Sequence, residues 1–246
     1  MCITFSTGTT VRRFGGGRVC FPPAIAGQPA NPHMPSFIPG PAGNLQITVD
    51  MPDGAPHGIA LISHPQPLLG GSPRHIVPYS AARRLRAAGW IAVRPSFRGV
   101  DGSEGEYDHG IGETEDTLAI AAQLRRQYPD LPLALVGFSF GAYVYARAAC
   151  RLEASAPAAA IALMGLPVGT VPRGRDYEPQ PLPDRALLLH GQDDDFSPLA
   201  NVLDWGAARH HPVVVFPGTD HFFKGCLPWA LDIVVGHLQH AVARPG

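Results

Sequence analysis

Short apolar runs alternate along the chain with longer segments in which apolar and polar residues mix at helical spacing. Most of the runs are rich in Val, Ile, Leu and Ala and contain few polar positions, which is typical of strands buried on both faces. The predicted strands are 45–50, 58–63, 90–95, 133–138, 158–164, 186–190 and 213–217. The predicted helices between and after them are 74–88, 113–128, 141–153, 198–209 and 227–242.

This alternation predicts an α/β fold. Parallel strands need long crossover connections, and the intervening helical segments supply them. We therefore expect a mostly parallel, doubly wound sheet of about seven strands, flanked by helices and without a large cap domain. Ser72 and Pro73 resemble a helix N-cap followed by Pro at the first helical position, and Gly89 follows the same helix. No internal sequence repeat accompanies the pattern.

The N-terminal 35 residues differ from the rest of the chain. They are rich in Gly and Pro, including Gly15–Gly17 and the pair Pro22–Pro23, which disfavours regular strands and helices. We predict an irregular arm over 1–35 and one folded domain over 36–246, beginning near Met34. Arg12 and Arg13 are not followed by the apolar stretch that an export signal requires.

Composition narrows the function classes. The chain has 246 residues, 16% of them charged, and a formal net charge of −1, with no run of basic residues that would suit nucleic acid or an anionic membrane. Four cysteines without CxxC spacing favour a reducing compartment, so we expect a cytoplasmic protein. No HxH or HExxH pattern suggests a metal, and we expect no cofactor. The sequence leaves a monomer and a homodimer open.

The stretch GFSFGAY at 137–143 places Ser139 between two glycines, where a predicted strand meets a predicted helix. Side chains at 137 and 141 would collide with neighbouring elements in so sharp a turn, which explains the glycines. The pattern therefore predicts a nucleophile elbow with Ser139 as the nucleophile. The alternative, a phosphate-binding loop, lacks the GK[ST] ending and the third glycine of a dinucleotide fingerprint.

A serine nucleophile needs a base and an acid that orients the base. The turn after 186–190 carries three adjacent aspartates, and the turn after 213–217 carries His221. The order Ser, Asp, His is the order used by hydrolases with this elbow. We predict a triad of Ser139, Asp194 and His221, with Asp193 and Asp195 still open as the acid.

Five ordered motifs carry a resemblance to a family. They are SHPQPLLGGS, RPSFRGVDGSEGEYDHGIGETED, GFSFGAY, HGQDDDFSP and PGTDHFF. Over about 36–243 the chain resembles small, mostly bacterial α/β-hydrolase-fold proteins without a large lid, distantly similar to dienelactone hydrolases and prolyl-oligopeptidase-type domains. The resemblance implies the α/β-hydrolase fold, and its HGxxD pattern matches His190, Gly191 and Asp194.

The oxyanion hole should use two backbone amides. One is that of Phe140, after the nucleophile, and the other comes from the loop after an early strand, His64–Pro67. Proline has no N–H, so Gln66 is the residue of the Pro-Gln-Pro run that can donate. For the substrate-binding wall we expect Leu68, Leu69 and Phe222, with Phe138, Phe140 and Phe223 as further candidates. A long loop near 164–184, without a regular pattern, is expected to shape specificity.

Arg98 and the remaining histidines have structural interpretations. Arg98 precedes a loop rich in acids, Asp101, Glu104, Glu106 and Asp108, and we expect it to fix that loop by an ion pair rather than to bind a substrate carboxylate. The segment 112–116 predicts a helix start with acids at its positive end. His190 is expected in the core at a strand end, and His33, His57, His210, His211, His237 and His240 in loops, at helix ends or on the surface.

Together these patterns predict a carboxylesterase-like serine hydrolase that cleaves small esters through an acyl-enzyme. A peptidase, thioesterase or lactonase would use the same triad. A binding protein that kept the fold and lost catalysis is the alternative from another class.

Overall fold

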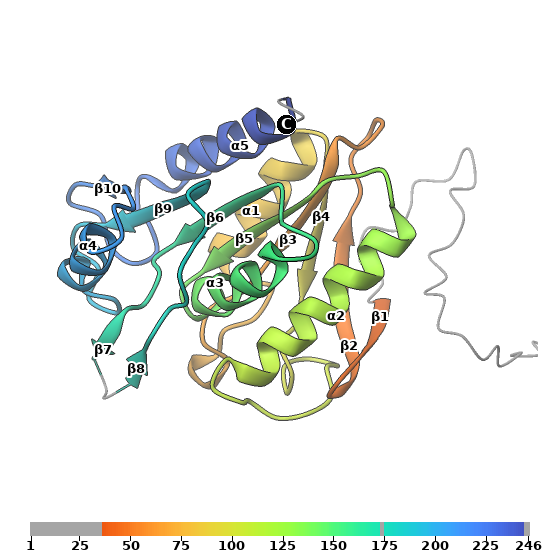
Figure 1. The fold of residues 1–246 in the computed structure, drawn as a ribbon, viewed down its shortest axis with the longest axis horizontal. Helices are drawn as coiled ribbons and strands as arrows, with labels where there is room; N and C mark the ends of the chain where they lie inside the picture. The colour runs from red at the N-terminus through yellow and green to blue at the C-terminus, as the bar shows by residue number, and fades with distance from the viewer. Residues whose placement is uncertain (1–35, 173–174, 244–246) are drawn as a thin grey trace, which may run out of the picture.

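The computed structural model describes residues 36–172 and 175–243. The predicted arm and the proposed start near Met34 lie outside these residues. The main sheet has eight strands (Figure 1). They are β1 (Ser36–Gly40), β2 (Gly43–Asp50), β3 (Gly58–Ile62), β4 (Trp90–Pro95), β5 (Leu133–Phe138), β6 (Ala160–Met164), β9 (Ala186–Gly191) and β10 (Val213–Phe216).

The strand order is β1-β2-β4-β3-β5-β6-β9-β10. From β4 to β10 every pairing is parallel, whereas β1 and β2 run antiparallel at one edge. The prediction of about seven strands missed β1, which forms a hairpin with β2 across the turn that ends at Gly43. Pro39 obscured this strand in the sequence, because proline is tolerated in strands mainly at a sheet edge.

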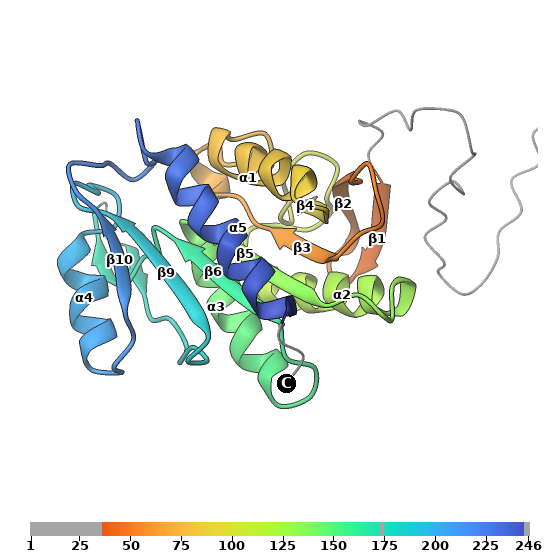
Figure 2. The same ribbon diagram turned by 90° about the horizontal axis from the view of Figure 1, so that it is seen from above.

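The helices cover both faces of the sheet (Figure 2). Side chains of α1 (Ile76–Ala87) and α5 (Leu227–Ala243) pack together in the core on one face. Side chains of α2 (Ile111–Gln127), α3 (Phe140–Glu153) and α4 (Leu199–Ala207) pack in the core on the other face. The strands from β3 to β6 are buried along their whole length, as their unbroken apolar sequences predicted. The fold class is confirmed.

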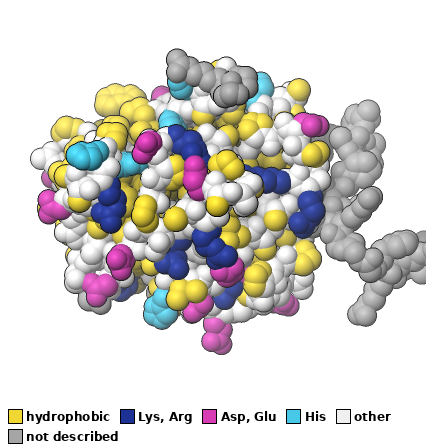
Figure 3. All heavy atoms as spheres, in the orientation of Figure 1, with side chains coloured by type: hydrophobic (Ala, Val, Ile, Leu, Met, Phe, Trp, Pro, Cys, Tyr) yellow, Lys and Arg dark blue, Asp and Glu magenta, His cyan; other side chains and the backbone are white. Residues whose placement is uncertain are grey.

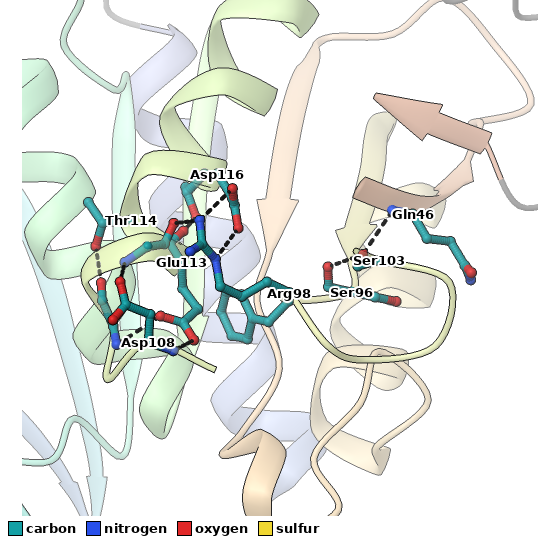
Figure 4. A network of polar contacts seen from close by, with 12 residues as sticks. Gln46, Ser96, Arg98, Ser103, Asp108, Glu113, Thr114 and Asp116 are labelled. Carbon is teal, nitrogen blue, oxygen red and sulfur yellow. Dashed lines mark hydrogen bonds and ion pairs between the residues drawn. The ribbon is translucent and has the colours of Figure 1, made fainter. Parts of the chain in front are cut away.

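Two predicted helix starts have different outcomes. α1 begins at Ile76, where the His75 side chain accepts a hydrogen bond from the Val77 amide, so the proposed N-cap at Ser72 was wrong. α2 begins as expected, because the Glu113 carboxylate accepts hydrogen bonds from the amides of Asp108 and Gly110 (Figure 4). A carboxylate there satisfies free N–H groups at the positive end of the helix.

The long loop after β6 contains two short strands, contrary to the expectation of no regular pattern. Within it, β7 (Gly169–Val171) and β8 (Arg175–Tyr177) pair antiparallel in a separate two-stranded sheet. Each strand has three residues, which is too short for an alternating apolar pattern to stand out. The Asn201 side chain of α4 donates to the carbonyls of Val168 and Thr170, which ties β7 to the main body.

Arg98 forms the predicted structural ion pair, but with another partner (Figure 4). Its guanidinium donates to both carboxylate oxygens of Asp116 on α2, at 2.7 and 2.9 Å, and to the Gly112 carbonyl. The Asp116 side chain is 3% exposed, so the pair is largely desolvated. The hydrogen bonds to Asp116 raise the pKa of Arg98. Arg98 thus fastens the loop after β4 to α2 instead of pairing with the acids of that loop.

On the face in Figure 3, acidic and basic side chains are interspersed, in keeping with the small net charge. No helix in the described residues is both long and apolar enough to cross a membrane.

Candidate active site

The elbow around Ser139 has the strained geometry that the glycines predicted. Ser139 connects β5 to α3 with φ 55° and ψ −127°, a conformation that non-glycine residues rarely adopt. A Cβ on Gly137 would lie 2.6 Å from Ala142 Cα, and one on Gly141 would lie 2.2 Å from Ser63 Oγ. Both glycines are therefore required by close approach, and together they allow the chain to present the Ser139 hydroxyl at the carboxyl edge of the sheet.

The structure brings together the three residues predicted as a triad. Ser139 Oγ lies 2.8 Å from His221 Nε2, and His221 Nδ1 lies 2.6 Å from Asp194 Oδ2. With the imidazole proton on Nδ1, His221 donates a hydrogen bond to Asp194, and its Nε2 accepts one from the Ser139 hydroxyl. This arrangement has the geometry of a nucleophile, a base and an orienting acid.

Asp194 is the aspartate that reaches His221. Its side chain is fully buried, and its Oδ1 accepts hydrogen bonds from the amides of Phe196 and Ser197 at 2.9 and 2.7 Å. Asp193 and Asp195 are exposed. Two amide donors on one oxygen leave Oδ2 to face His221, so the turn itself fixes the carboxylate.

Space for the imidazole comes from Gly165, at the end of β6 between the strands that carry Ser139 and Asp194. A Cβ on Gly165 would lie 3.0 Å from His221 Cε1. Around the ring, Phe138 and Phe196 each lie 5.1 Å away between centroids, and His221 is 2% exposed. The aromatic side chains shield the base from water, which strengthens its interactions with the two partners.

Ser139 and His221 open onto a cavity of about 300 Å³. Its other lining residues come from the loop after β3, from the first residue of α3, from the segment that carries β7 and β8, and from the turns after β9 and β10. They are Pro65, Gln66, Leu69, Gly70, Gly71, His75, Phe140, Pro167, Val171, Arg175, Tyr177, Phe196, Ser197 and Phe222. A cavity of this volume is at the small end of ligand-binding sites.

The loop with Gln66 is held beside Ser139 by His64. His64 Nδ1 donates to the Pro65 carbonyl at 2.8 Å, and Nε2 accepts from the Phe97 amide at 3.0 Å. Burial lowers the pKa of His64 to about 4, which keeps the ring neutral and able to make both bonds. The Pro65 carbonyl and the Gln66 N–H belong to one rigid peptide plane, so fixing the first also fixes the second.

The predicted donors of the oxyanion hole both lie on the cavity wall. In the part of the chain that the structure describes, neither the Phe140 nor the Gln66 amide donates a hydrogen bond to another group. The Phe140 amide is the first of α3, where backbone N–H groups lack helical partners. The Gln66 side chain instead donates to the hydroxyls of Tyr107 and Tyr177.

Of the three residues predicted to bind substrate, Leu69 and Phe222 line the cavity. Leu68, in the same short 3-10 turn Pro67–Leu69, is not among the residues that line the cavity, and it is 68% exposed to solvent. That part of the prediction is corrected. Phe223 is fully buried against Phe216 in the core.

The other histidines largely match their structural interpretation. His190 is buried in β9, where Nε2 donates to the Ser197 carbonyl, and burial lowers its pKa. His237 lies in α5 and contacts the Ile161 carbonyl, so it is a half-buried helix residue rather than a loop or surface one. His33 lies outside the described residues.

Sequence reasoning missed several residues around the cavity. His75, Phe196, Arg175 and Tyr177 line it, and Gly165 makes room for His221. Phe196 had a local signal, since it directly follows the aspartate turn. Arg175 and Tyr177 had none, because only the hairpin of β7 and β8 brings them to the site. Among the described residues, no cluster of three His, Cys, Asp or Glu side chains could hold a metal ion.

Comparisons with known proteins agree with this architecture. An α/β serine hydrolase without lid from Xanthomonas campestris is 36% identical, with a TM-score of 0.71 over 86% of this chain and 94% of the other. An α/β serine hydrolase homologue from Coxiella burnetii is 29% identical, with a TM-score of 0.72 over 86% of this chain and all of the other. An uncharacterized protein of Rickettsia prowazekii is 30% identical over 196 residues, 76% of this chain and 81% of its own length.

No family model matches the sequence. The solved structures nevertheless define the class as the α/β-hydrolase fold. The chain belongs to the α/β serine hydrolases, a family that includes the lidless Xanthomonas protein, and it is accordingly a hydrolase.

Proposed function

We propose that this hydrolase is a carboxylesterase-like enzyme for small esters, with Ser139, His221 and Asp194 as its catalytic triad. The observation that carries the proposal is the unbroken chain of contacts from Ser139 Oγ through His221 to the buried Asp194, opening onto a cavity of about 300 Å³. That volume suits a short ester better than a folded polypeptide.

In the first half of the proposed reaction, Ser139 Oγ attacks the ester carbonyl while His221 Nε2 takes the hydroxyl proton. Asp194 stabilises the imidazolium that forms. The amides of Phe140 and Gln66 bind the oxyanion, and the loss of one such donor costs about 3 kcal/mol in the barrier. Cleavage of the carbon–oxygen bond then releases the alcohol, which receives the proton from His221.

In the second half, His221 removes a proton from water, which attacks the acyl-Ser139 carbonyl. The bond between the acyl carbon and Ser139 Oγ then breaks, the acid product leaves, and His221 returns the proton to Ser139 Oγ. Each turnover thus consumes one ester and one water and yields one acid and one alcohol. None of these steps requires a cofactor. We also place the enzyme in the cytoplasm, which the free thiols of Cys150 and Cys226 support.

The test is hydrolysis of 4-nitrophenyl acetate and butyrate by the wild type and by Ser139→Ala and His221→Ala. We expect the wild type to release nitrophenol and both variants to lose at least about a thousandfold of that rate. Circular dichroism and a thermal melt establish that the variants are folded. Wild-type turnover in both folded variants would refute the proposal.

A further inference from the structure

One wall of the active-site cavity carries a full positive charge. Arg175, on β8, lines the cavity, and none of the described residues that line it is Asp or Glu. Burial, together with the neighbouring His221, lowers the pKa of His75, another lining residue, which keeps that ring neutral near pH 7. At neutral pH the cavity is therefore electropositive on the side of Arg175.

Arg175 has no carboxylate partner among residues 36–172 and 175–243. By contrast, Arg94 and Arg98, two guanidiniums in the body of the protein, each form an ion pair with an aspartate. Arg175 Nη1 donates to the Tyr177 hydroxyl at 3.1 Å, and among the described residues no other group accepts a hydrogen bond from its guanidinium, which leaves N–H donors for a ligand. A guanidinium with free donors matches a carboxylate, which can bind two of them at once.

Hydrogen bonds fix this guanidinium on the same wall as the loop after β3. The Tyr177 hydroxyl accepts from Arg175 and, at 3.3 Å, from the Gln66 side-chain amide. Burial raises the pKa of Tyr177, so its hydroxyl stays neutral. The Arg175 carbon Cζ also lies 5.9 Å from the centre of the Tyr177 ring, a favourable cation–π distance. The charge is thus held beside Gln66, whose backbone amide we assign to the oxyanion.

We propose that the substrate is an ester that also carries a carboxylate within a few bonds of the scissile carbonyl, and that Arg175 binds this carboxylate. The inference rests on the proposed esterase function and specifies its substrate class. The cavity volume of about 300 Å³ limits the span between the two groups to a short chain or one ring. The Leu69 and Phe222 side chains supply apolar contacts for the carbon atoms between them.

Two matched pairs of substrates compare an anionic ester with a neutral one. One pair carries the carboxylate on the acyl side of the ester bond, and the other carries it on the leaving group. The first pair is the mono-4-nitrophenyl ester of adipic acid and 4-nitrophenyl hexanoate, whose acyl chains have the same number of carbon atoms. The second pair is 4-acetoxybenzoate and 4-acetoxybenzamide, which differ in the charge on the leaving group. For at least one pair, we expect the wild type to show a kcat/KM about tenfold or more higher for the anion. Added salt should reduce this preference.

The variant Arg175→Gln removes the charge, and we expect the anion preference to fall by about tenfold to a hundredfold. Arg83→Gln is the matched control, because Arg83 is an exposed arginine on α1 that contacts Tyr79 away from the cavity. It should keep the wild-type preference. Asp195 lines a small hollow together with Arg175, although the two form no ion pair in the described residues. If Asp195→Asn produced the same loss as Arg175→Gln, Arg175 would act through Asp195 and the inference would be overturned.

The outcomes separate this inference from the proposed function. If the wild type hydrolyses the neutral esters and prefers neither anion, only the proposed role of Arg175 is refuted, and the esterase function stands. The wild-type preference and its dependence on salt do not depend on whether Arg175→Gln folds. If the wild type cleaves no ester of either pair and Ser139 does not react with an active-site probe, the proposed function fails, and this inference fails with it.

Discussion

Asp194→Asn is the substitution whose consequence follows most closely from the structure. Asp194 Oδ1 accepts two amide hydrogen bonds, from Phe196 and Ser197, and Oδ2 faces His221. Asparagine has one oxygen and one NH2 group. Because the two amides require an acceptor, the asparagine oxygen takes the Oδ1 position and its NH2 group faces His221 Nδ1.

This arrangement forces His221 into the wrong tautomer. An NH2 group opposite Nδ1 makes that nitrogen an acceptor, so the proton moves to Nε2, which then cannot accept the proton of Ser139. The loss in kcat for such a change is about 10⁴-fold, equivalent to about 5.5 kcal/mol in the activation barrier. The assay is the steady-state hydrolysis of 4-nitrophenyl butyrate at pH 7.5, with a thermal melt of each variant.

The neighbouring aspartates provide matched controls. Asp193 and Asp195 are exposed and flank Asp194 in the same turn. Asp193→Asn and Asp195→Asn make the same chemical change, and we expect kcat for this neutral ester to stay close to the wild-type value. A folded Asp194→Asn that kept more than about a tenth of wild-type kcat, or a control that lost as much, would refute this reasoning.

Three further substitutions test the elbow, the loop after β3 and the packing of α2. Gly141→Ala places a methyl group against backbone, so we expect it to lower the free energy of unfolding by about 1–3 kcal/mol and to reduce activity. The control Gly236→Ala lies at an open helical position and should raise the free energy of unfolding by up to about 1 kcal/mol. Both values come from urea unfolding. His64→Gln tests how the stability depends on pH. The pKa of His64 is lowered from 6.5 to about 4 in the folded protein, so as the pH falls from about 6.5 to 4 the unfolded chain binds a proton that the folded protein does not. The free energy of unfolding therefore falls over this pH range. Between pH 7 and pH 5 the wild type should lose about 2 kcal/mol more than the variant, and an equal loss in both would contradict the prediction. Arg98→Met leaves the buried Asp116 carboxylate unpaired and should lower the free energy of unfolding in urea by about 3–5 kcal/mol. Arg151→Met, at an exposed ion pair, should lower it by at most about 1 kcal/mol. Similar losses for the two variants would argue against burial as the cause.

Much of the architecture could be predicted from sequence because its strongest signals are local. Buried parallel strands appear in the sequence as unbroken apolar runs. The glycines around Ser139 indicate a sharp turn that few other sequences can form. The carboxyl ends of parallel strands meet at one edge of a sheet, so residues after β5, β9 and β10 were expected to converge. In the structure Ser139, Asp194 and His221 do meet there.

The features that were missed depend on contacts between distant segments. Nothing in the sequence near Arg98 points to Asp116, because the loop acids are closer along the chain and only packing places α2 beside the guanidinium. Leu68 and Leu69 are adjacent, and the rotation of a single 3-10 turn decides which one reaches the cavity. Arg175 reaches the cavity through a hairpin of two three-residue strands, which is too short to show in a hydrophobic pattern.

The most direct test of the central claim is the reaction of the purified protein with a fluorophosphonate probe, followed by mass spectrometry of the peptides. The probe modifies serines that an adjacent base activates. We predict one adduct on Ser139 in the wild type and none in a folded Ser139→Ala. No adduct on Ser139 in folded wild type, or equal labelling of the Ser139→Ala variant, would contradict the proposed triad.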